Sequence, residues 1–293
     1  SQSRPFSVAD DLALALRLAK LADAITLDRY QSLDLIIETK PDATPVTDAD
    51  KAVEKAIREI LANERPNDLV VGEEFGGREL VTDSTNHSHQ SQNSQHYWVI
   101  DPIDGTKNFL RGIPVWATLI GLSTPENEVI AGVVSAPALS RTWYAGKNLG
   151  AFVVETTGAS ADEGKSESKS GSLVSKQRAI KVSQVSRLED AQLSYSDLIG
   201  WGERKSAFLA LQEEVWRTRA FGDFWSHMLV AEGAVDIAVE PSLSLWDMAA
   251  LEIIVKEAGG SFTNLDGVNG SHGGSLVTSN GKLHDDFLKA LRG

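Results

Sequence analysis

The chain has 293 residues, of which 42% are hydrophobic and 24% charged, a balance typical of a globular protein with one large domain or two of ordinary size. Its formal net charge of −13 argues against binding to nucleic acid or to an anionic membrane. The absence of cysteine excludes disulfides and thiolate metal ligands. With no apolar window long enough to cross a bilayer and no signal-peptide layout at its N-terminus, the sequence predicts a cytoplasmic protein.

The N-terminal part of the chain predicts two helices and a short strand. Apolar residues recur at helical spacing over 14–25, which indicates a long amphipathic helix. A second helix is expected to begin near Thr47. The apolar run 69–72 then predicts a strand that ends directly at Glu73 and Glu74.

Two polar segments interrupt the next part of the chain. We interpret 78–96 as a mobile loop, because its Ser, Asn, Gln and His residues bury little apolar surface. Several short β-rich runs over 98–154 predict an antiparallel meander. The second polar segment, 155–176, is typical of a linker or an exposed hairpin. We place a domain boundary there, which divides the chain into 1–155 and 156–293.

The C-terminal part alternates candidate strands and helices, as an α/β layer does. The strand candidates are 180–182, 192–194, 235–239 and 276–278. The helix candidates are 204–214, 224–232 and 248–258.

The stretch from Trp98 to Thr106 carries the strongest chemical signal. An apolar run delivers Asp101 and Asp104 into the loop that follows, where Gly105 lets the backbone approach a ligand closely. Carboxylate oxygens beside free backbone N–H groups are what a magnesium ion and a phosphate together require. The alternative is a strand that ends in an ordinary Asp-Gly turn.

Other acidic residues stand at predicted element ends, and each has a structural alternative. Glu73 follows a strand. Asp50 lies three residues after Thr47 and completes a capping box. Asp247 precedes a periodic apolar run and is a candidate N-cap. If these groups converge, two like charges about 4 Å apart repel by roughly 4 kcal/mol at an effective dielectric near 20, so protons or divalent cations must neutralise them. Oxygen donors without histidine or cysteine favour Mg²⁺ or Mn²⁺ over zinc.

Taken together, these segments resemble the signature of the inositol monophosphatase family in order and spacing. The matching motifs are Val46–Asp50, Gly72–Glu74, Trp98–Thr106, Trp246–Ala250 and Glu257–Gly260. The resemblance implies a Mg²⁺-dependent phosphomonoesterase with a mixed α+β and α/β fold. That fold is the layered α-β-α-β-α sandwich of the inositol monophosphatase and fructose bisphosphatase type. It also implies a homodimer and a small-molecule phosphate monoester as substrate.

The resemblance also implies site residues, distributed between an N-terminal domain with most metal ligands and a C-terminal domain with Asp247 and the substrate pocket. The first Mg²⁺ would be held by Glu73, Asp101 and the carbonyl of Ile103. The second would be held by Asp101, Asp104 and Asp247. Glu73 would assist a third ion and the catalysis.

Further residues are implied for the reaction itself. Thr106 and Asp50 would orient and deprotonate the attacking water. The N–H groups of Gly105 and Thr106 would bind the phosphate. Asp223 and Glu240 are expected beside the leaving group, with Asp247 also at the substrate. For Asp223 a helix N-cap is the structural alternative.

Within the family, the chain is most similar to the branch that hydrolyses L-histidinol phosphate. The segments that carry this similarity are 104–109, 111–116, 219–224 and 231–236. Histidinol carries an ammonium and a partly protonated imidazole, which acidic pocket walls favour. The alternatives are an inositol-1-phosphate or other sugar phosphatase, a 3′,5′-bisphosphate nucleotidase, and a catalytically silent homologue that acts as a regulatory binding protein.

Overall fold

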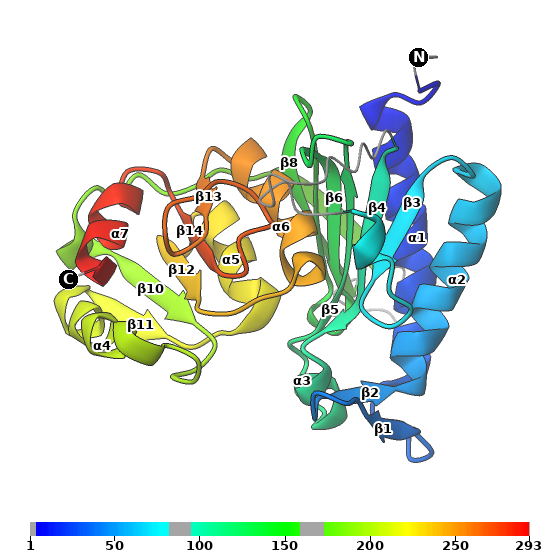
Figure 1. Cartoon of the computed structure of the whole chain (residues 1–293), viewed down its shortest axis with the longest axis horizontal. Coiled ribbons are helices and arrows are strands. Elements are labelled where there is room, and N and C mark those ends of the chain that lie inside the picture. The colour runs from blue at the N-terminus through cyan, green and yellow to red at the C-terminus, as the bar shows by residue number, and fades with distance from the viewer. Residues whose placement is uncertain (1–3, 82–94, 159–172, 293) are drawn as a thin grey trace, which may run out of the picture.

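Two β-sheets separated and flanked by helices form the frame of the protein (Figure 1). This computed structural model describes residues 4–81, 95–158 and 173–292. From one side to the other, the layers are an outer helix pair, a seven-stranded sheet, a central helix pair, a five-stranded sheet and a second outer helix pair. The first outer pair consists of α1 Val8–Arg29 and α2 Asp48–Glu64. The central pair consists of α5 Asp223–Ala231 and α6 Leu245–Glu257, and the second outer pair of α4 Lys205–Glu214 and α7 His284–Arg292. The predicted α-β-α-β-α sandwich is confirmed.

The seven-stranded sheet contains the predicted meander. Its order is β3-β4-β5-β6-β7-β8-β9, and every neighbouring pair is antiparallel except β3 with β4. The strands are β3 Leu69–Gly72, β4 Tyr97–Asp104, β5 Ala117–Ser123, β6 Val129–Ala136, β7 Arg141–Gly146, β8 Gly150–Gly158 and β9 Leu173–Ala179. Every residue of β5 and β6 is buried, because helices cover both faces of this sheet.

The two polar segments fall partly outside the described residues. Of the predicted loop 78–96, residues 82–94 lie there, and Arg78–Leu80 forms one 3₁₀ turn, η1. Of the segment 155–176, residues 159–172 lie there. Its described ends belong to β8 and β9, which pair as an antiparallel hairpin. The expected boundary after residue 155 thus falls within β8, and the division into two domains stays a prediction.

The five-stranded sheet has the order β11-β10-β12-β14-β13, with β10 parallel to both of its neighbours. Its strands are β10 Gln192–Tyr195, β11 Arg217–Arg219, β12 Ile237–Glu240, β13 Ser261–Thr263 and β14 Leu276–Ser279. The predicted strand at 180–182 is wrong. The N–H of Ile180 donates to Ala151 O and that of Val182 to Ala258 O, so this segment crosses between elements instead of pairing with one strand.

Short elements complete the fold. Sequence analysis did not predict β11, β13, α7, the hairpin of β1 Ile37–Thr39 and β2 Pro45–Thr47, or the short helix α3 Thr106–Leu110. Three further 3₁₀ turns are η2 Pro137–Leu139, η3 Leu188–Asp190 and η4 Gly202–Arg204. Among the described helices, none has the length and apolar character needed to cross a membrane.

The helix α6 approaches the large sheet closely enough to fix the position of its N-terminus. A Cβ atom built on Gly132 of β6 would lie 2.7 Å from the carbonyl oxygen of Ala250, and one on Gly121 of β5 would lie 3.1 Å from the Ala250 nitrogen. Only glycine permits such close contact of backbone with backbone. The first turn of α6, which carries Asp247, is therefore held beside the end of β4.

Candidate active site

The end of β4 directs two carboxylates out of the sheet. The pairing of β4 with β5 shifts its register between Asp101 and Asp104, and such an irregularity re-aims the side chains that it carries. Gly105 follows with φ of 85°, and a Cβ there would lie 2.8 Å from the carbonyl oxygen of Val115. Both the backbone conformation and the space therefore require glycine at this turn. The backbone N–H of Phe224 donates to Asp104 Oδ2 at 2.8 Å and joins α5 to this turn.

Asp247 reaches the same place from α6. The helix begins at Leu245, with Ser244 as its N-cap, so the alternative of Asp247 as the N-cap is wrong. Asp247 lies in the first turn, where its Oδ2 accepts a hydrogen bond from the Ser244 N–H at 2.7 Å. A carboxylate in the first turn of a helix is stabilised by the helix dipole.

Asp101, Asp104 and Asp247 form the group of potential metal ligands that the described residues contain. One carboxylate oxygen from each lies within 4.8 Å of the others. Burial and the neighbouring carboxylates raise the pKa of Asp101 and of Asp104 well above the ordinary value, and burial raises the pKa of Asp247 to about 7. The cluster therefore needs protons or cations to become stable.

The donor set fits a hard divalent cation. Asp101 is 1% exposed, and its Oδ1 has no hydrogen-bond partner within the part of the chain that the structure describes. An unpartnered buried carboxylate oxygen is costly unless a cation binds it. All the potential ligands are oxygen atoms, which suits Mg²⁺ or Mn²⁺.

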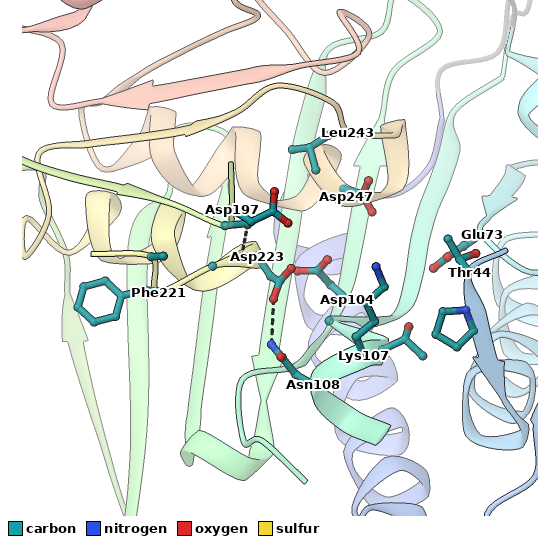
Figure 2. Close-up of a pocket in the computed structure, with 16 residues that line it drawn as sticks. Thr44, Glu73, Asp104, Lys107, Asn108, Asp197, Phe221, Asp223, Leu243 and Asp247 are labelled. Atoms are coloured by element: carbon teal, nitrogen blue, oxygen red, sulfur yellow. Dashed lines mark hydrogen bonds between the residues drawn. The ribbon is translucent and has the colours of Figure 1, made fainter. Parts of the chain in front are cut away.

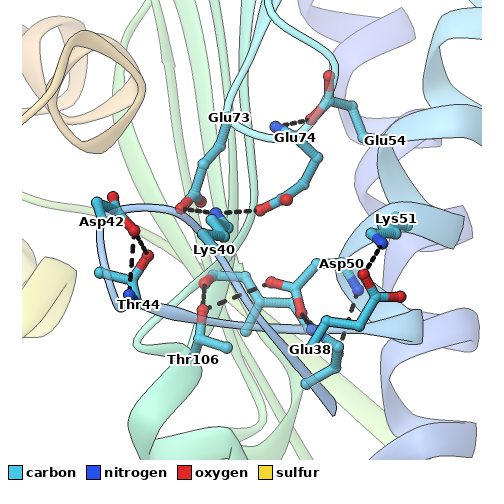
Figure 3. Close-up of polar contacts among 12 residues, drawn as sticks. Glu38, Lys40, Asp42, Thr44, Asp50, Lys51, Glu54, Glu73, Glu74 and Thr106 are labelled. Atoms are coloured by element: carbon cyan, nitrogen blue, oxygen red, sulfur yellow. Dashed lines mark hydrogen bonds and ion pairs between the residues drawn. The ribbon is translucent and has the colours of Figure 1, made fainter. Parts of the chain in front are cut away.

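Glu73 lines the same pocket as Asp104 and Asp247, but Lys40 holds it (Figure 3). The Lys40 Nζ donates to Glu73 Oε1 at 2.7 Å and to Glu74 Oε1 at 2.6 Å. Burial raises the pKa of Glu74 to about 7. The structure thus brings Glu73 to the site without including it in the compact group of three aspartates.

A buried glutamate that sequence analysis missed fixes the turn that carries Glu73. The Oε2 of Glu54 on α2 accepts the Glu74 N–H at 2.7 Å, and its Oε1 accepts the Phe75 N–H at 3.1 Å. Glu54 is fully buried and also pairs with Arg58 at 2.8 Å. Its position on the apolar face of α2 was the available signal, because a charged residue there must have a buried partner.

The side chains of Asp50 and Thr106 approach each other beside the pocket (Figure 3). Asp50 completes the predicted capping box, with its Oδ2 accepting the Thr47 N–H at 2.8 Å. Its Oδ1 lies 3.5 Å from Thr106 Oγ1, which is also 3.0 Å from the carbonyl oxygen of Ile103. Burial raises the pKa of Asp50 to about 6. The carbonyl of Ile103 therefore lies beside Thr106, and its expected place as a metal ligand stays a prediction.

An open pocket of about 530 Å³ is bordered by four of these residues, Glu73, Asp104, Thr106 and Asp247 (Figure 2). Figure 2 shows Asp104, Asp223 and Asp247 pointing into the same space. The pocket is lined by Thr44, Pro45, Glu73, Asp104, Gly105, Thr106, Lys107, Asn108, Ser196, Asp197, Ala220, Phe221, Gly222, Asp223, Leu243 and Asp247.

The two residues expected at the leaving group lie on the α5 and β12 side. The helix α5 begins at Asp223 with Gly222 in the N-cap position, so the N-cap alternative for Asp223 is wrong. Asp223 Oδ2 accepts a hydrogen bond from Asn108 Nδ2 at 3.0 Å, and burial raises its pKa to about 6. Glu240 accepts a hydrogen bond from the Ser196 hydroxyl, and burial raises its pKa to about 8.

The sequence pattern of the inositol monophosphatase family matches residues 8–293, nearly the whole chain. The chain belongs to the inositol monophosphatase family. Members of this family are generally metal-dependent, and the aspartate cluster supplies a fitting set of oxygen ligands. The layered fold implied by the sequence resemblance is shared with solved family members. The IMPase of Thermotoga maritima matches with a TM-score of 0.76 and 26% identity over 97% of each chain.

Two relatives are far more similar in sequence. A Streptomyces coelicolor protein named histidinol-phosphatase is 52% identical over 287 residues, which cover 96% of this chain and 97% of that protein. A Mycobacterium tuberculosis protein of the same name is 50% identical over 284 residues, with 96% and 98% covered. Both relatives therefore carry the name of the branch of the inositol monophosphatase family that the sequence resemblance indicated.

Proposed function

We propose that this protein hydrolyses L-histidinol phosphate to L-histidinol and phosphate with Mg²⁺ as its metal. The observation that carries the proposal is the identity of 52% and 50% to two histidinol-phosphatases over almost the full length of all three chains. A phosphomonoesterase is also what the oxygen-rich pocket and its carboxylate cluster suit chemically.

For the metal we propose two or three Mg²⁺ ions, with Mn²⁺ as a possible substitute. Asp101, Asp104 and Asp247 would hold them together with Glu73 and the Ile103 carbonyl. When bound, such ions screen the charge of a phosphate monoester and lower the pKa of a water nucleophile. Lys40 contributes a positive charge against Glu73 in the structure, so metal and lysine compete for this carboxylate.

For the water nucleophile we propose that Thr106 orients it and that Asp50 takes up its proton. Thr106 Oγ1 would accept a hydrogen bond from the water and donate its own proton to Asp50 Oδ1 at 3.5 Å, once the Ile103 carbonyl oxygen, its nearer acceptor at 3.0 Å, is engaged by metal. The raised pKa of Asp50, about 6, makes it a stronger base than an exposed aspartate, and it is still mostly ionised near neutral pH.

For the substrate we propose that the backbone N–H groups of Gly105 and Thr106 bind the phosphate oxygens at the floor of the pocket. Asp223 and Glu240 face the leaving alcohol. Their carboxylates favour a cationic amino alcohol over a neutral polyol, because opposite charges attract in a partly desolvated site. Burial raises the pKa of Glu240 to about 8, so this carboxyl becomes negatively charged only when a neighbouring cation, such as that of the amino alcohol, lowers its pKa again.

A substrate panel tests the proposal. Purified protein is assayed with histidinol phosphate, inositol 1-phosphate, a sugar phosphate and a 3′,5′-bisphosphorylated nucleotide, each with added MgCl₂, with MnCl₂ or with EDTA. We expect kcat/KM for histidinol phosphate to exceed the others by at least about tenfold and EDTA to abolish it. Preference for a rival ester by the same margin would replace the substrate assignment, and no turnover of any ester would favour a silent homologue.

The homodimeric state and the cytoplasmic location belong to the same proposal. Both come from the family resemblance and the composition, and no described segment is assigned as a dimer interface. Light scattering coupled to gel filtration measures the first, and fractionation of cells measures the second.

A further inference from the structure

A recess beside the catalytic pocket contains a buried histidine that the mechanism above does not use. The recess has a volume of about 190 Å³ and shares Asp104, Ser196, Asp223, Leu243 and Asp247 with the outer pocket. Its other walls include Phe224, His227, Glu240 and Leu251, all of them buried. A volume of this size holds several water molecules and therefore a five-membered ring.

His227 is held rigidly at one nitrogen and is unpartnered at the other. Its Nδ1 lies 2.8 Å from the Thr278 hydroxyl on β14. Its Nε2 is buried and has no hydrogen-bond partner within residues 4–81, 95–158 and 173–292. Burial lowers the pKa of His227 to about 3, so its ring is neutral and Nε2 either donates or accepts one hydrogen bond. A buried polar atom without a partner is costly, and because His227 borders the recess, a ligand or a water held there can satisfy Nε2.

We propose that the recess receives the imidazole ring of histidinol and that Nε2 of His227 forms a hydrogen bond with that ring, which makes His227 a specificity-determining residue. The inference rests on the proposed function and deepens it. An imidazole carries one N–H donor and one acceptor nitrogen when neutral and two donors when protonated. When the Nδ1–H of His227 donates to Thr278, Nε2 is an acceptor and complements an N–H of the imidazole ring in either protonation state. When Nε2 carries the proton instead, it complements the acceptor nitrogen of a neutral imidazole ring.

The other walls suit the same ring. Phe224 and Leu251 present apolar surface to a flat heterocycle, and Glu240 supplies a second polar partner from β12. A polyol such as inositol would place hydroxyl groups against these apolar side chains, and each hydroxyl left without a partner costs binding free energy. A site built to hydrogen-bond one group discriminates strongly against ligands that lack it.

The test uses a substitution that removes Nε2 and keeps the contact with Thr278. The side-chain amide of asparagine reaches the position of Nδ1 but not that of Nε2. In His227→Asn we expect the ratio of kcat/KM for histidinol phosphate to kcat/KM for glycerol 2-phosphate to fall by about 10- to 100-fold. In His227→Gln, whose amide extends to the position of Nε2, we expect part of the ratio to return.

The matched control is His284→Asn. His284 is also buried, but its ring nitrogens lie 2.8 Å from Thr263 Oγ1 and 2.8 Å from Ser279 Oγ, and it is absent from the recess lining. We expect this variant to keep the wild-type ratio even where its melting temperature falls. An equal loss of both activities in His227→Asn, or an unchanged ratio, would overturn the inference and assign His227 a structural role.

A binding measurement keeps the inference testable if the variants unfold. Wild-type protein labelled with ¹⁵N in its histidine rings is titrated with L-histidinol and, separately, with glycerol. We expect L-histidinol alone to shift the ring nitrogen resonance of the histidine that stays neutral at acidic pH. If the wild type prefers histidinol phosphate but no such shift occurs, only this inference fails. If the wild type does not prefer histidinol phosphate, the proposed function fails first.

Discussion

The hydroxyl oxygen of Thr106 lies 3.5 Å from Oδ1 of Asp50, although 56 positions separate the two residues. The two oxygen atoms of the Asp50 carboxylate have different partners. Its Oδ2 accepts the backbone N–H of Thr47 and closes the first turn of α2, and its Oδ1 faces Thr106. The capping alternative and the catalytic assignment considered for Asp50 are therefore compatible with each other.

Substitution of Asp50 separates these two roles. In Asp50→Asn the amide oxygen still accepts the Thr47 N–H, so we expect the melting temperature to change little. The amide cannot accept a proton, so we expect kcat to fall by about 10²- to 10⁴-fold. The matched control is Asp10→Asn, which alters the equivalent capping box of α1 with Ser7 far from the pocket. Activity of Asp50→Asn within a few-fold of wild type would contradict its role as a base.

Removing one carboxylate from the buried cluster tests metal binding directly. In Asp101→Asn we expect Mg²⁺ to lose its stabilising effect in thermal melts and turnover to fall by orders of magnitude, because a ligand stabilises a fold only if it binds. In EDTA the variant should melt at or above the wild-type temperature, since one repelling charge is gone. Asp236→Asn is the control, a buried aspartate that accepts the Gln192 N–H away from the pocket, and it should keep the Mg²⁺ effect.

The buried Glu240 predicts a pH dependence of stability in metal-free protein. Burial raises its pKa from 4.5 to about 8, so the folded protein binds this proton more tightly than the unfolded chain does. Its contribution is complete below pH 4.5 and is lost as the pH rises toward 8. We expect the free energy of unfolding in EDTA to fall over this window, with Glu240 adding up to about 1.4 kcal/mol per pH unit. Chemical unfolding of Glu240→Gln should show a shallower dependence, and an unchanged slope would contradict the assignment.

The order of elements could be predicted where periodicity was strong. The meander shows successive short β-rich runs and the helix α1 shows apolar residues at helical spacing, and the structure confirms both. The strand β11 at Arg217–Arg219 could not be predicted, because a partly exposed edge strand with three polar residues has no apolar alternation. The segment 180–182 alternates buried Ile180 and half-buried Val182 with exposed Lys181, and this alternation alone does not distinguish a crossing between β8 and α6 from a strand.

The site was predicted better by family motifs than by local chemistry. Asp101 and Asp104 were expected in the loop after a strand; both belong instead to β4 Tyr97–Asp104, whose register shift re-aims them, and the structure brings both to Asp247. Nothing local indicates that α6 would carry Asp247 to them, because that depends on close packing of the helix on Gly121 and Gly132. His227 could not be predicted from the sequence for the same reason, because the burial of Nε2 without a partner depends on the packing of α5 against β14.

Glu54 does not line the pocket, but it supports the turn that carries Glu73, and this role can be tested. Its carboxylate binds the N–H groups of Glu74 and Phe75, so in Glu54→Ala we expect the turn that carries Glu73 to lose its anchor. Removal of such an outer partner typically weakens metal binding by about 10- to 100-fold. Titration calorimetry with Mn²⁺ measures this loss, and Glu54→Gln should restore part of it because its amide oxygen still accepts a hydrogen bond. The control Glu59→Ala, on the same helix, should bind Mn²⁺ as the wild type does. If Glu54→Ala lowers the melting temperature but leaves Mn²⁺ affinity unchanged, the glutamate supports the fold alone and Glu73 is positioned by other contacts.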